Sequence, residues 1–327
     1  MLLLSKSHLS AVLSMRDVID AVETGFRSLA TGNATVPERL KLDLPARQAV
    51  LLEMPAYADL RGPALGTKIV SVFQNNTARG LGIVQAAYLL LDSETGVPLS
   101  LMDGQFITGI RTAATSAVAT KFMLNPGAQR LAVYGAGVQA RFHIQAMLEV
   151  AEIKEIMIVS RTLETARALA DYTLNQNRIV SSLAEPDEAA AKADLICMCT
   201  SSPTPLFNGG LIQPGTHINA VGAFTPTTRE LDSEAVRRAR VFIDAGSAAG
   251  SEAGELLIPL SEGAIDSTHI KGTLADVVSG RIAGRESASD ITLFKSCGLA
   301  IEDLVTAQVA YDRALAKGIG LSFNLDN

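Results

Sequence analysis

The sequence is poor in the residues that mark several classes of protein. Its 327 residues include no tryptophan, 5% aromatic residues and three cysteines, Cys197, Cys199 and Cys297. Three clustered cysteines are too few for a disulfide framework, and no His/Cys spacing near them is typical of zinc, so we expect reduced, mostly buried thiols and no metal site. Stretches rich in Lys or Arg are also missing from a chain with a formal charge of −6, which argues against a nucleic-acid partner.

Long hydrophobic runs are missing too. The only apolar run near the N-terminus, Met1 to Leu4, ends at Ser5 and Lys6, and it is too short for a signal peptide or a membrane span. We therefore expect a cytoplasmic protein without membrane contact. Apolar residues nevertheless make up 48% of the chain, enough for a large core, and chains of this length often form two domains.

The apolar spacing before residue 125 predicts two helices and a β-meander. Apolar residues from Ser14 to Leu29 recur at three- and four-residue steps, which is typical of an amphipathic helix. Short apolar segments separated by turn residues then predict strands at 49–54, 66–73, 83–91 and 98–102. Residues 107–124 follow as a single predicted helix.

After Asn125-Pro126-Gly127 the pattern alternates between strand and helix. It predicts strands at 131–134, 156–159, 195–199, 217–221 and 240–244, and helices at 138–150, 163–172 and 299–316. This alternation is typical of a parallel, doubly wound sheet. Because the alternation starts in the middle of the chain, we expect a separate domain before it, and we expect the last helix to return to that domain.

A glycine-rich loop follows the first strand of this alternating region. The run Gly135-Ala136-Gly137-Val138-Gln139-Ala140 fits the dinucleotide-binding fingerprint of Rossmann domains, G-x-G-x-x-G/A. In that fingerprint the first glycine makes a tight turn, the second lets backbone N–H groups approach a pyrophosphate, and the small last residue allows close helix packing. The alternative is a simple glycine turn. The position between a strand and a helix favours the dinucleotide site.

The end of the second strand indicates which nicotinamide cofactor is used. NAD sites usually carry an acidic residue there, about 20 residues after the glycine loop. This chain instead carries Ser160-Arg161-Thr162, in which a guanidinium flanked by two hydroxyls suits a 2′-phosphate. We therefore predict NADPH as the cofactor, with NADH as the alternative. In the competing interpretation Arg161 is a solvated residue beside a helix cap.

Four blocks of the sequence resemble the ornithine cyclodeaminase/mu-crystallin family. They are residues 108–116, residues 135–141, residues 219–223 with Pro226, Arg229, Glu230 and Leu231, and residues 294–300 with Glu302, Asp303 and Leu304. The resemblance implies an α/β fold in which a Rossmann domain with a doubly wound parallel sheet joins an α+β substrate-binding and dimerisation domain. We place the Rossmann domain at residues 119–304 and the other at residues 1–118 with 305–327. The resemblance also implies a nicotinamide cofactor, a small amino- or imino-acid substrate and a homodimer.

One position separates the activities known in this family. In its ornithine cyclodeaminases a catalytic Asp follows a Val-Gly pair by two residues, where this chain has Phe224. Phenylalanine cannot exchange a proton or hold an ammonium group, so deamination is disfavoured. The Gly-Ala-Phe-Thr-Pro run resembles that of the bacterial Δ1-pyrroline-2-carboxylate reductases, which reduce cyclic imino acids such as Δ1-pyrroline-2-carboxylate or Δ1-piperideine-2-carboxylate to L-proline or L-pipecolate. Ornithine or lysine cyclodeamination, alanine dehydrogenation and mu-crystallin-like ligand binding are the alternatives.

The resemblance also implies which residues hold the substrate. Arg39, Lys68 and Arg111 lie where the family places basic substrate-binding residues, and Phe224 would supply an apolar wall against the ring; its alternative is a core aromatic. We expect Lys68 at the start of a buried strand, where it binds the carboxylate or gives the imine a proton. Arg111 is expected in the first turn of its helix, where the dipole also favours an anion, and is assigned to the cofactor site as well.

The remaining candidates concern the cofactor. We assign to its binding site the glycine-loop residues and those that follow the later strands, namely Gly135, Gly137, Val138, Gln139, Ala140, Ser160, Arg161, Thr162, Thr200, Ser201, Val221, Gly222, Ala223, Lys295 and Ser296. Open α/β sheets bind ligands at the carboxyl ends of their strands, where most of these residues are expected. His143 and His217 fall inside predicted regular elements, so we expect them to be part of the scaffold.

Overall fold

The structure is a computed structural model that describes residues 1–59, 62–245 and 250–325. The chain divides into two compact units, one of residues 1–111 with 299–327 and one of residues 112–298. The last helix belongs to the first unit. The predicted domain bounds at 118/119 and 304/305 stay a prediction.

The first unit is built on a mixed sheet. Its strands lie in the order β16-β1-β7-β6-β5-β4-β2, and β3 pairs with β4 beside that path. Strands β4 to β7 form the predicted antiparallel meander, whereas β1 pairs in parallel with β7. The bounds are β1 (Leu2–Leu4), β2 (Ala34–Thr35), β3 (Leu40–Leu44), β4 (Ala49–Asp59), β5 (Pro63–Phe73), β6 (Val84–Leu91), β7 (Pro98–Asp103) and β16 (Leu321–Ser322).

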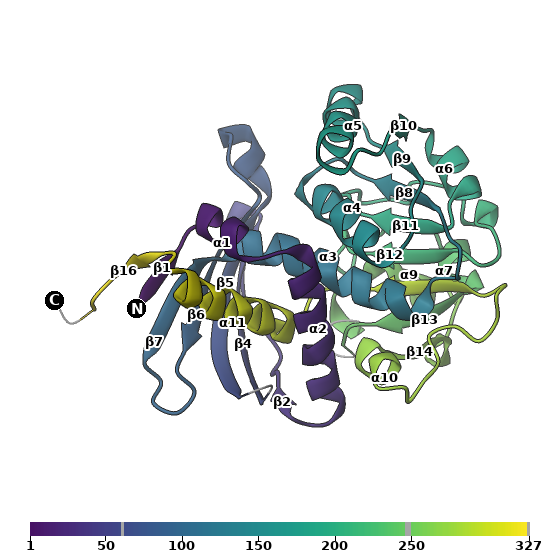
Figure 1. The fold of residues 1–327 in the computed structure, drawn as a ribbon. Helices are drawn as coiled ribbons and strands as arrows, with labels where there is room; N and C mark the ends of the chain where they lie inside the picture. Colours follow the sequence, from purple (N-terminus) through teal and green to yellow (C-terminus); the bar gives the residue numbers. More distant parts are fainter. Residues whose placement is uncertain (60–61, 246–249, 326–327) are drawn as a thin grey trace. The chain divides into compact units, whose positions relative to one another are not determined.

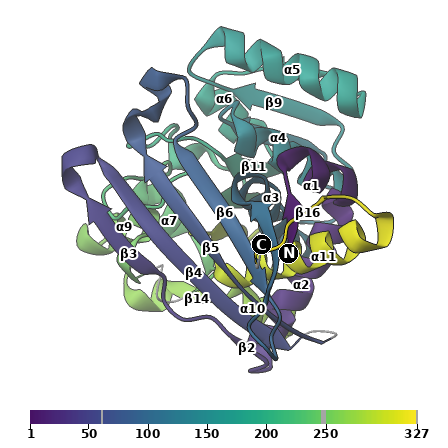
Figure 2. The same ribbon diagram turned by 90° about the vertical axis from the view of Figure 1, so that its left-hand side faces the viewer.

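Helices cover one face of this sheet. The amphipathic α2 (Met15–Ala30) and the C-terminal α11 (Ala300–Lys317) pack against each other, and α11 also packs on β4, β5 and β6, as Figure 1 shows. Alternate residues of β5 are buried beneath them, from Ala64 to Val72. The opposite face of the meander is turned toward the viewer in Figure 2. The short α1 (Lys6–Val12) packs against α11 and β7.

The second unit contains an entirely parallel sheet. Its strand order is β10-β9-β8-β11-β12-β15-β13-β14, and each neighbouring pair is parallel. The order reverses between β8 and β11, which is the topological switch point of a doubly wound fold. The bounds are β8 (Arg130–Tyr134), β9 (Glu155–Val159), β10 (Ser181–Leu183), β11 (Leu195–Met198), β12 (His217–Ala220), β13 (Ala239–Ile243), β14 (Ile270–Thr273) and β15 (Ile291–Lys295).

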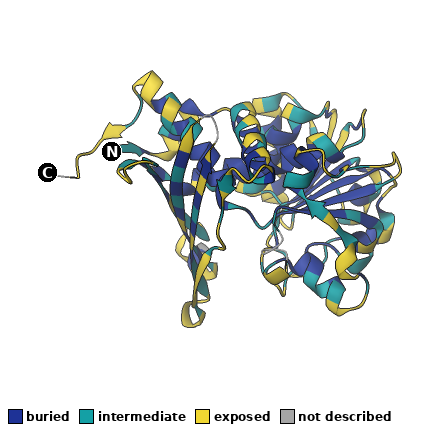
Figure 3. Cartoon of the chain, turned by 90° about the horizontal axis from the view of Figure 1, so that it is seen from below, coloured by how far each residue is buried: buried dark blue, intermediate teal, exposed yellow. Residues whose placement is uncertain are grey.

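The central strands of this sheet are buried on both faces, as Figure 3 shows. Every residue of β11, β12 and β15 is buried, as expected for strands covered by helices on both sides. The helices of the unit whose bounds the structure describes include the second half of α3 (Gly104–Met123), α4 (Val138–Val150), α5 (Leu163–Asn177), α6 (Pro186–Lys192), α7 (Ser233–Arg238), α9 (Gly254–Ser261) and α10 (Leu274–Val278).

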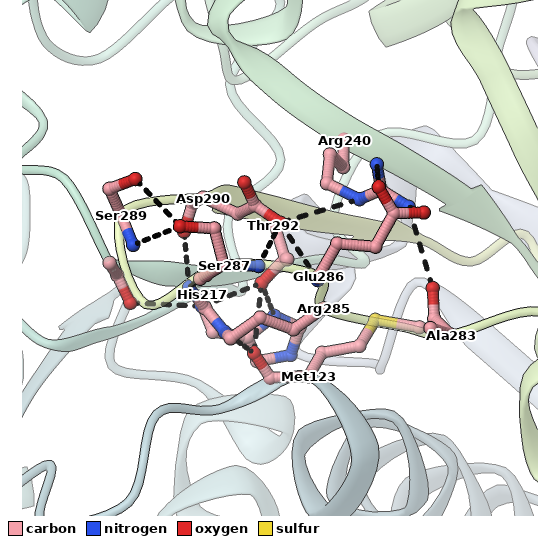
Figure 4. Close-up of polar contacts among 11 residues, drawn as sticks. Met123, His217, Arg240, Ala283, Arg285, Glu286, Ser287, Ser289, Asp290 and Thr292 are labelled. Carbon is pink, nitrogen blue, oxygen red and sulfur yellow. Dashed lines mark hydrogen bonds and ion pairs between the residues drawn. The ribbon is translucent and has the colours of Figure 1, made fainter.

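One half-buried arginine ties the carboxyl end of α3 to the amino ends of two central strands. Arg285 donates from Nε to the Met123 carbonyl at 2.8 Å and from Nη2 to the Gly215 carbonyl at 2.9 Å. It also donates to the Thr292 hydroxyl at 3.2 Å, and Figure 4 shows these contacts converging on its side chain. Helix carbonyls at a C-terminus lack intrahelical partners, and a cation there satisfies them.

The predicted elements agree with the structure in most places. The helix predicted at 138–150 has the bounds of α4, and the strands of the meander were found with shifted ends. Short elements such as β2, β3, β10 and α6 were missed. The most important omission is β15, which lies between β12 and β13 in the centre of the parallel sheet.

Candidate active site

Two basic side chains and two acidic ones meet inside the first unit. Lys68 on β5 donates to Asp303 Oδ2 on α11 at 2.7 Å. Arg111 on α3 donates from Nε to Asp303 Oδ1 at 3.0 Å and from Nη1 to Glu302 Oε2 at 2.6 Å. Asp303 therefore bridges both cations. All four side chains are buried, so the cluster holds two positive and two negative groups away from water.

Burial changes the proton affinity of Lys68. Loss of solvation lowers the pKa of its ammonium to about 8, with Asp303 acting in the opposite direction and Arg111 in the same direction. Burial also raises the pKa of the nearby Tyr88 phenol, with Asp303 adding to the effect. Lys68 is thus a buried ammonium that can release its proton close to neutral pH.

Two expectations about these cations were wrong in detail. Lys68 lies in the middle of β5, which begins at Pro63, and not at the start of the strand. Arg111 is not in the first turn of its helix, because α3 begins at Gly104 and Asp103 accepts the backbone N–H of Phe106. A helix dipole acts within the first turn, so Arg111 owes nothing to it. The environment of Arg111 is set by Glu302 and Asp303 instead.

Arg39 and Phe224 lie outside the buried ion cluster. Arg39 directly precedes β3, as expected, and is partly buried. Phe224 belongs to the second unit and is 39% exposed. The interpretation of Phe224 as a core aromatic is therefore wrong, and its ring is accessible to a ligand.

The glycine loop in the second unit has the geometry of a phosphate cradle. Gly135 follows β8 with φ +105°, and a Cβ placed on it would lie 2.6 Å from the Cys199 carbonyl oxygen. Gly137 is the N-cap residue of α4, with open space where its side chain would be. The buried Ala140 lets α4 pack closely, and Val138 is exposed. Open N–H groups at a helix N-terminus next to a switch point fit the pyrophosphate of a dinucleotide.

The residues expected at the ribose lie directly after β9. Arg161 is exposed, and the hydroxyls of Ser160 and Thr162 both contact Thr165 Oγ1, at 2.9 and 2.6 Å. Thr162 is the N-cap residue of α5, but its side chain makes no capping hydrogen bond. The three residues thus present a cation and hydroxyl groups at the end of a parallel strand.

A second set of buried charges lies among the loops of this unit. Glu230 Oε1 accepts the N–H and the hydroxyl of Thr200, at 2.7 and 2.6 Å, and Oε2 accepts the N–H of Gly222 at 2.8 Å. Glu255 Oε1 accepts the N–H of Glu230 at 2.8 Å, and Glu255 Oε2 lies 3.0 Å from Lys295 Nζ. Burial and the neighbouring Glu255 carboxylate raise the pKa of Glu230 to about 7.

Lys295 and Ser296 are buried and engaged by the protein itself. Lys295 Nζ donates to the Ala223 carbonyl as well as pairing with Glu255. Burial acts to lower the pKa of Lys295, but the carboxylate of Glu255 outweighs it and the net direction is upward. Ser296 donates to Asp244 Oδ2 at 2.9 Å. These contacts join the end of β15 to the segments that carry Ala223, Asp244 and Glu255. The cofactor candidates Ser201 and Val221, in contrast, are at least partly exposed.

The two central histidines are buried and lie in regular elements, where they were predicted. His143 lies inside α4, with Nε2 3.0 Å from the Ser116 hydroxyl, and His217 lies inside β12, with Nδ1 2.9 Å from Thr292 Oγ1. Burial lowers the pKa of His143 to about 4 and that of His217 to about 3. Both rings are therefore neutral at neutral pH and act as hydrogen-bonding parts of the core.

The sequence interpretation missed the acidic half of both clusters. Glu230, Glu302 and Asp303 were noticed only as part of the family resemblance, and Glu255 was not noticed. The sequence does contain a sign of Glu302 and Asp303. Both lie in the first turn of a helix, and the residues on either side of them are apolar. Carboxylates on the buried side of a helix need a cation or other partner.

Comparison with known proteins gives consistent results along the whole chain. The model of the ornithine cyclodeaminase/mu-crystallin family matches residues 1–318. A Δ1-pyrroline-2-carboxylate reductase of Bacillus cereus is 35% identical over 322 residues, which cover 98% of each chain.

Two solved structures have a similar fold over nearly the full length. The Δ1-pyrroline-2-carboxylate reductase of Thermococcus litoralis, in complex with NADH and L-proline, has a TM-score of 0.96 and 41% identity, covering 99% of this chain and 100% of that one. An archaeal alanine dehydrogenase dimer with bound NAD has a TM-score of 0.93 and 32% identity, covering 99% of both chains. Among the helices that the structure describes, none has the length and apolar character needed to cross a membrane.

Proposed function

Because this chain belongs to the ornithine cyclodeaminase/mu-crystallin family, we propose that it reduces a cyclic imino acid with a nicotinamide nucleotide. The substrates we propose are Δ1-pyrroline-2-carboxylate and its six-membered homologue Δ1-piperideine-2-carboxylate, and the products are L-proline and L-pipecolate. The observation that carries the proposal is the buried cluster of Lys68, Arg111, Glu302 and Asp303. The names and bound ligands of the similar reductases support the same substrate class.

The charge balance of this cluster suits the substrate. A cyclic imino acid with a protonated imine carries one negative carboxylate and one positive nitrogen, so it is neutral as a whole. Lys68 and Arg111 provide positive groups for the carboxylate, and Asp303 and Glu302 provide negative groups for the iminium nitrogen. A buried cluster with two charges of each sign accepts such a zwitterion without a net buried charge, which would be costly.

Each basic residue has a distinct part in the proposed reaction. Arg111 holds the carboxylate and fixes its orientation through its planar guanidinium. Lys68, with its lowered pKa, either donates a proton at the imine nitrogen or shares the carboxylate with Arg111. When bound, the nicotinamide nucleotide supplies the hydride that the imine carbon accepts. Phe224 provides an apolar surface for the ring, and Arg39 is a further candidate for the carboxylate.

Kinetics of Lys68→Ala decide between the two functions of Lys68. A lower kcat is expected if the lysine assists protonation, and mainly a higher KM if it only binds the carboxylate. Lys121→Ala, which removes a lysine from α3, serves as the matched control. Near-normal imine reduction by the Arg111→Ala, Lys68→Ala double variant would contradict this assignment of the site.

We propose NADPH as the preferred nucleotide and NADH as the weaker alternative. The Gly135, Gly137 and Ala140 cradle supports a dinucleotide, and the exposed Arg161 between two hydroxyl residues supports a 2′-phosphate. The remaining residues that we propose for the cofactor site lie at or after the carboxyl ends of the parallel strands of the second unit. They are Val138, Gln139, Ser160, Thr162, Thr200, Ser201, Val221, Gly222, Ala223, Lys295 and Ser296. Arg111, which belongs to the first unit, is a further candidate.

A substrate panel tests the proposed reaction. NADPH oxidation is measured with Δ1-pyrroline-2-carboxylate, with Δ1-piperideine-2-carboxylate, and with pyruvate plus ammonia. Saturable oxidation with either imine is expected, and the ratio of the two kcat/KM values gives the ring preference. Turnover only with pyruvate and ammonia would identify an alanine dehydrogenase. Nucleotide binding without any turnover would identify a ligand-binding protein.

A second assay tests the exclusion of deamination. Ornithine with NAD⁺ should release no ammonia, because Phe224 cannot hold an ammonium group or exchange a proton at the position of the cyclodeaminase Asp. Phe224→Asp restores the acid but should not give efficient deamination, since the ornithine side chain also needs space and partners. Robust ammonia release by the unmodified protein would overturn the reductase assignment.

We also propose a homodimer formed through the outer face of the meander, in the cytoplasm. Tyr57, Ile69 and Leu101 stand on the face of β4, β5 and β7 opposite the helices, each at least 39% exposed. Such an apolar sheet face is typical of an interface. Light scattering should give twice the 34.4 kDa chain mass. Ile69→Asp should shift the protein toward monomer, while Leu315→Asp on α11 should not, and a monomeric unmodified protein would contradict the proposal.

A further inference from the structure

Glu230 is a buried carboxylate that the proposed reaction does not use. It lies in the loop between β12 and α7, and its side chain is fully buried. Its three acceptor contacts go to Thr200, which follows β11, and to Gly222, which follows β12. The carboxylate therefore joins two loops at the carboxyl ends of neighbouring parallel strands, where doubly wound sheets bind their ligands.

The same contacts extend to the glycine loop. A Cβ on Gly135 would lie 2.6 Å from the Cys199 carbonyl oxygen and 3.4 Å from Thr200 Cγ2, so the loop after β8 rests on the segment that Glu230 holds. A Cβ on Gly222 would in turn lie 2.4 Å from Glu230 Oε2 and 2.1 Å from the Thr200 carbonyl oxygen. The carboxylate thus fits tightly between the two loops that it joins, with no room for a side chain at position 222.

The surroundings of Glu230 keep its carboxylate fixed. Glu255 on α9 accepts the backbone N–H of Glu230, and Lys295 at the end of β15 pairs with Glu255. A buried carboxylate is costly unless its oxygens are hydrogen-bonded, and here all three partners of Glu230 come from the loops that it joins. The hydrogen bonds that offset the cost of burying this charge form only when the two loops have the arrangement seen here.

We propose that Glu230 is a positioning residue for the nucleotide. Glu230 holds the loops after β11 and β12 directly, and the loop after β8 through Thr200 and Cys199, in the arrangement that binds the nucleotide before the nucleotide arrives. This inference rests on the proposed function only for the identity of the nucleotide. Preformed loops reduce the ordering cost of binding. Loss of Glu230 should therefore weaken nucleotide binding and leave binding of the imine largely unchanged.

The main test compares Glu230→Gln with Glu234→Gln. A glutamine keeps the size of the side chain, but only the oxygen of its carboxamide accepts hydrogen bonds. Either Thr200 or Gly222 therefore faces the NH₂ group, which cannot accept its N–H. Glu234 is the matched control because it lies in the same unit, and its side chain is 40% exposed and pairs with Arg237 on α7. NADH binding is followed by the fluorescence of the reduced nicotinamide, which no tryptophan of the chain complicates.

The dissociation constant of Glu230→Gln should rise by roughly tenfold or more, the effect of losing a hydrogen bond to a charged group. Glu234→Gln should stay within about twofold of the unmodified protein. In steady-state assays the KM for nucleotide should rise in Glu230→Gln and the KM for imine should not. Equal dissociation constants for the two variants would overturn the inference. Because binding is measured without turnover, failure of the imine assay alone would count against the proposed reaction and not against this function of Glu230.

A pH series adds a readout that a general loss of structure would not give. The groups facing Glu230 are Glu255, Lys295 and Cys199, and the pKa of Glu230 is raised to about 7 by burial and by Glu255. Protonation removes acceptor positions, so the affinity of the unmodified protein for NADH should fall from pH 8 to pH 6. NADH is used because it lacks a titrating 2′-phosphate. The Glu230→Gln variant should lose this pH dependence, and a variant that keeps it would contradict the inference.

If Glu230→Gln does not fold, the unmodified protein still gives an answer. NMR-detected hydrogen exchange without nucleotide should find the N–H groups of Thr200 and Gly222 protected at least tenfold more than those of Ser201 and Phe224 in the same loops. Exchange of all four at similar rates would show that the loops are not held in advance, and would overturn the proposal.

Discussion

The two units bury charge in different ways. In the first unit Lys68 and Arg111 face Glu302 and Asp303, so positive and negative groups are equal in number. In the second unit two buried carboxylates, Glu230 and Glu255, lie next to each other, and the cation Lys295 pairs with Glu255.

The first cluster therefore consists of ion pairs between side chains, whereas the second satisfies its excess carboxylate with backbone N–H groups of loops. In the balanced cluster, each side chain can exchange its ion-pair partner for a charged group of a ligand. In the cluster with the excess carboxylate, that carboxylate fixes the backbone of the loops, and its raised pKa makes its charge depend on pH.

Breaking the balance of the first cluster should have the largest effect. Arg111→Ala removes a cation that the substrate carboxylate needs and leaves Glu302 and Asp303 short of a partner. We expect kcat/KM for the imine to fall on the order of a hundredfold or more, about 3 kcal/mol of transition-state stabilisation. Arg27→Ala, which removes an exposed arginine of α2 paired with Glu23, should stay within about twofold. Near-normal turnover by Arg111→Ala would contradict the assignment.

The excess carboxylate of the second cluster should make stability depend on pH. The pKa of Glu230 is about 7 in the folded protein and lower in the unfolded chain. Folding therefore binds a proton between these values, and the stabilisation present at low pH is lost as the pH rises through about 7.

Chemical denaturation at pH 5 and pH 8 measures this effect. The free energy of unfolding should decrease by about 3 kcal/mol in the unmodified protein relative to Glu230→Gln over this range. The same difference at both pH values would show that Glu230 is ionised throughout.

The exposed cation of the second unit should have a smaller effect than the buried ones. Arg161→Ala removes the proposed partner of the 2′-phosphate, so NADPH binding should weaken by roughly 1.5–3 kcal/mol while NADH binding changes little. Calorimetric titration with both nucleotides measures this. Arg167→Ala, from the exposed side of α5, is the control. Equal use of both nucleotides by the unmodified protein, with no loss in Arg161→Ala, would exclude the NADP preference.

The first cluster should respond to pH through Lys68, above neutral pH. The pKa of Lys68 is lowered to about 8 in the folded protein, below its value in the unfolded chain. The stabilisation from this residue is therefore present at high pH and lost as the pH falls through about 8. Between pH 8 and 9.5 the free energy of unfolding should rise by about 2 kcal/mol relative to Lys68→Met. An identical response of both proteins would show that Lys68 keeps its ordinary proton affinity.

The sequence predicted the elements whose signal is local. The bounds of α4 follow from the glycine loop before it and the apolar period within it, and the meander follows from turn residues between short apolar strands. The strand β15 was missed because five buried residues without alternation, after a polar loop, look the same in a helix or a strand. α9 was not predicted because Pro259, a residue that usually ends a helix, lies inside it.

The site was predicted by residue type but not by pairing. Lys68 and Arg111 were identified, but Lys68 and Asp303 are 235 positions apart, and no local pattern reports a contact of that kind. The sequence analysis therefore did not predict that both cations have carboxylate partners within the protein. Glu255 was missed for the same reason, since its partners Glu230 and Lys295 lie on other elements.

The discontinuous first unit has a consequence for synthesis on the ribosome. The second unit is one continuous stretch, residues 112–298, whereas α11 and its two carboxylates belong to the first unit and are translated after it. Lys68 and Arg111 thus leave the ribosome long before Glu302 and Asp303, and cannot be buried with them until α11 has been translated. Nascent chains generally fold from the N-terminus, but here we expect the later, continuous unit to fold first. The meander must wait for α11 before its buried cations have their partners.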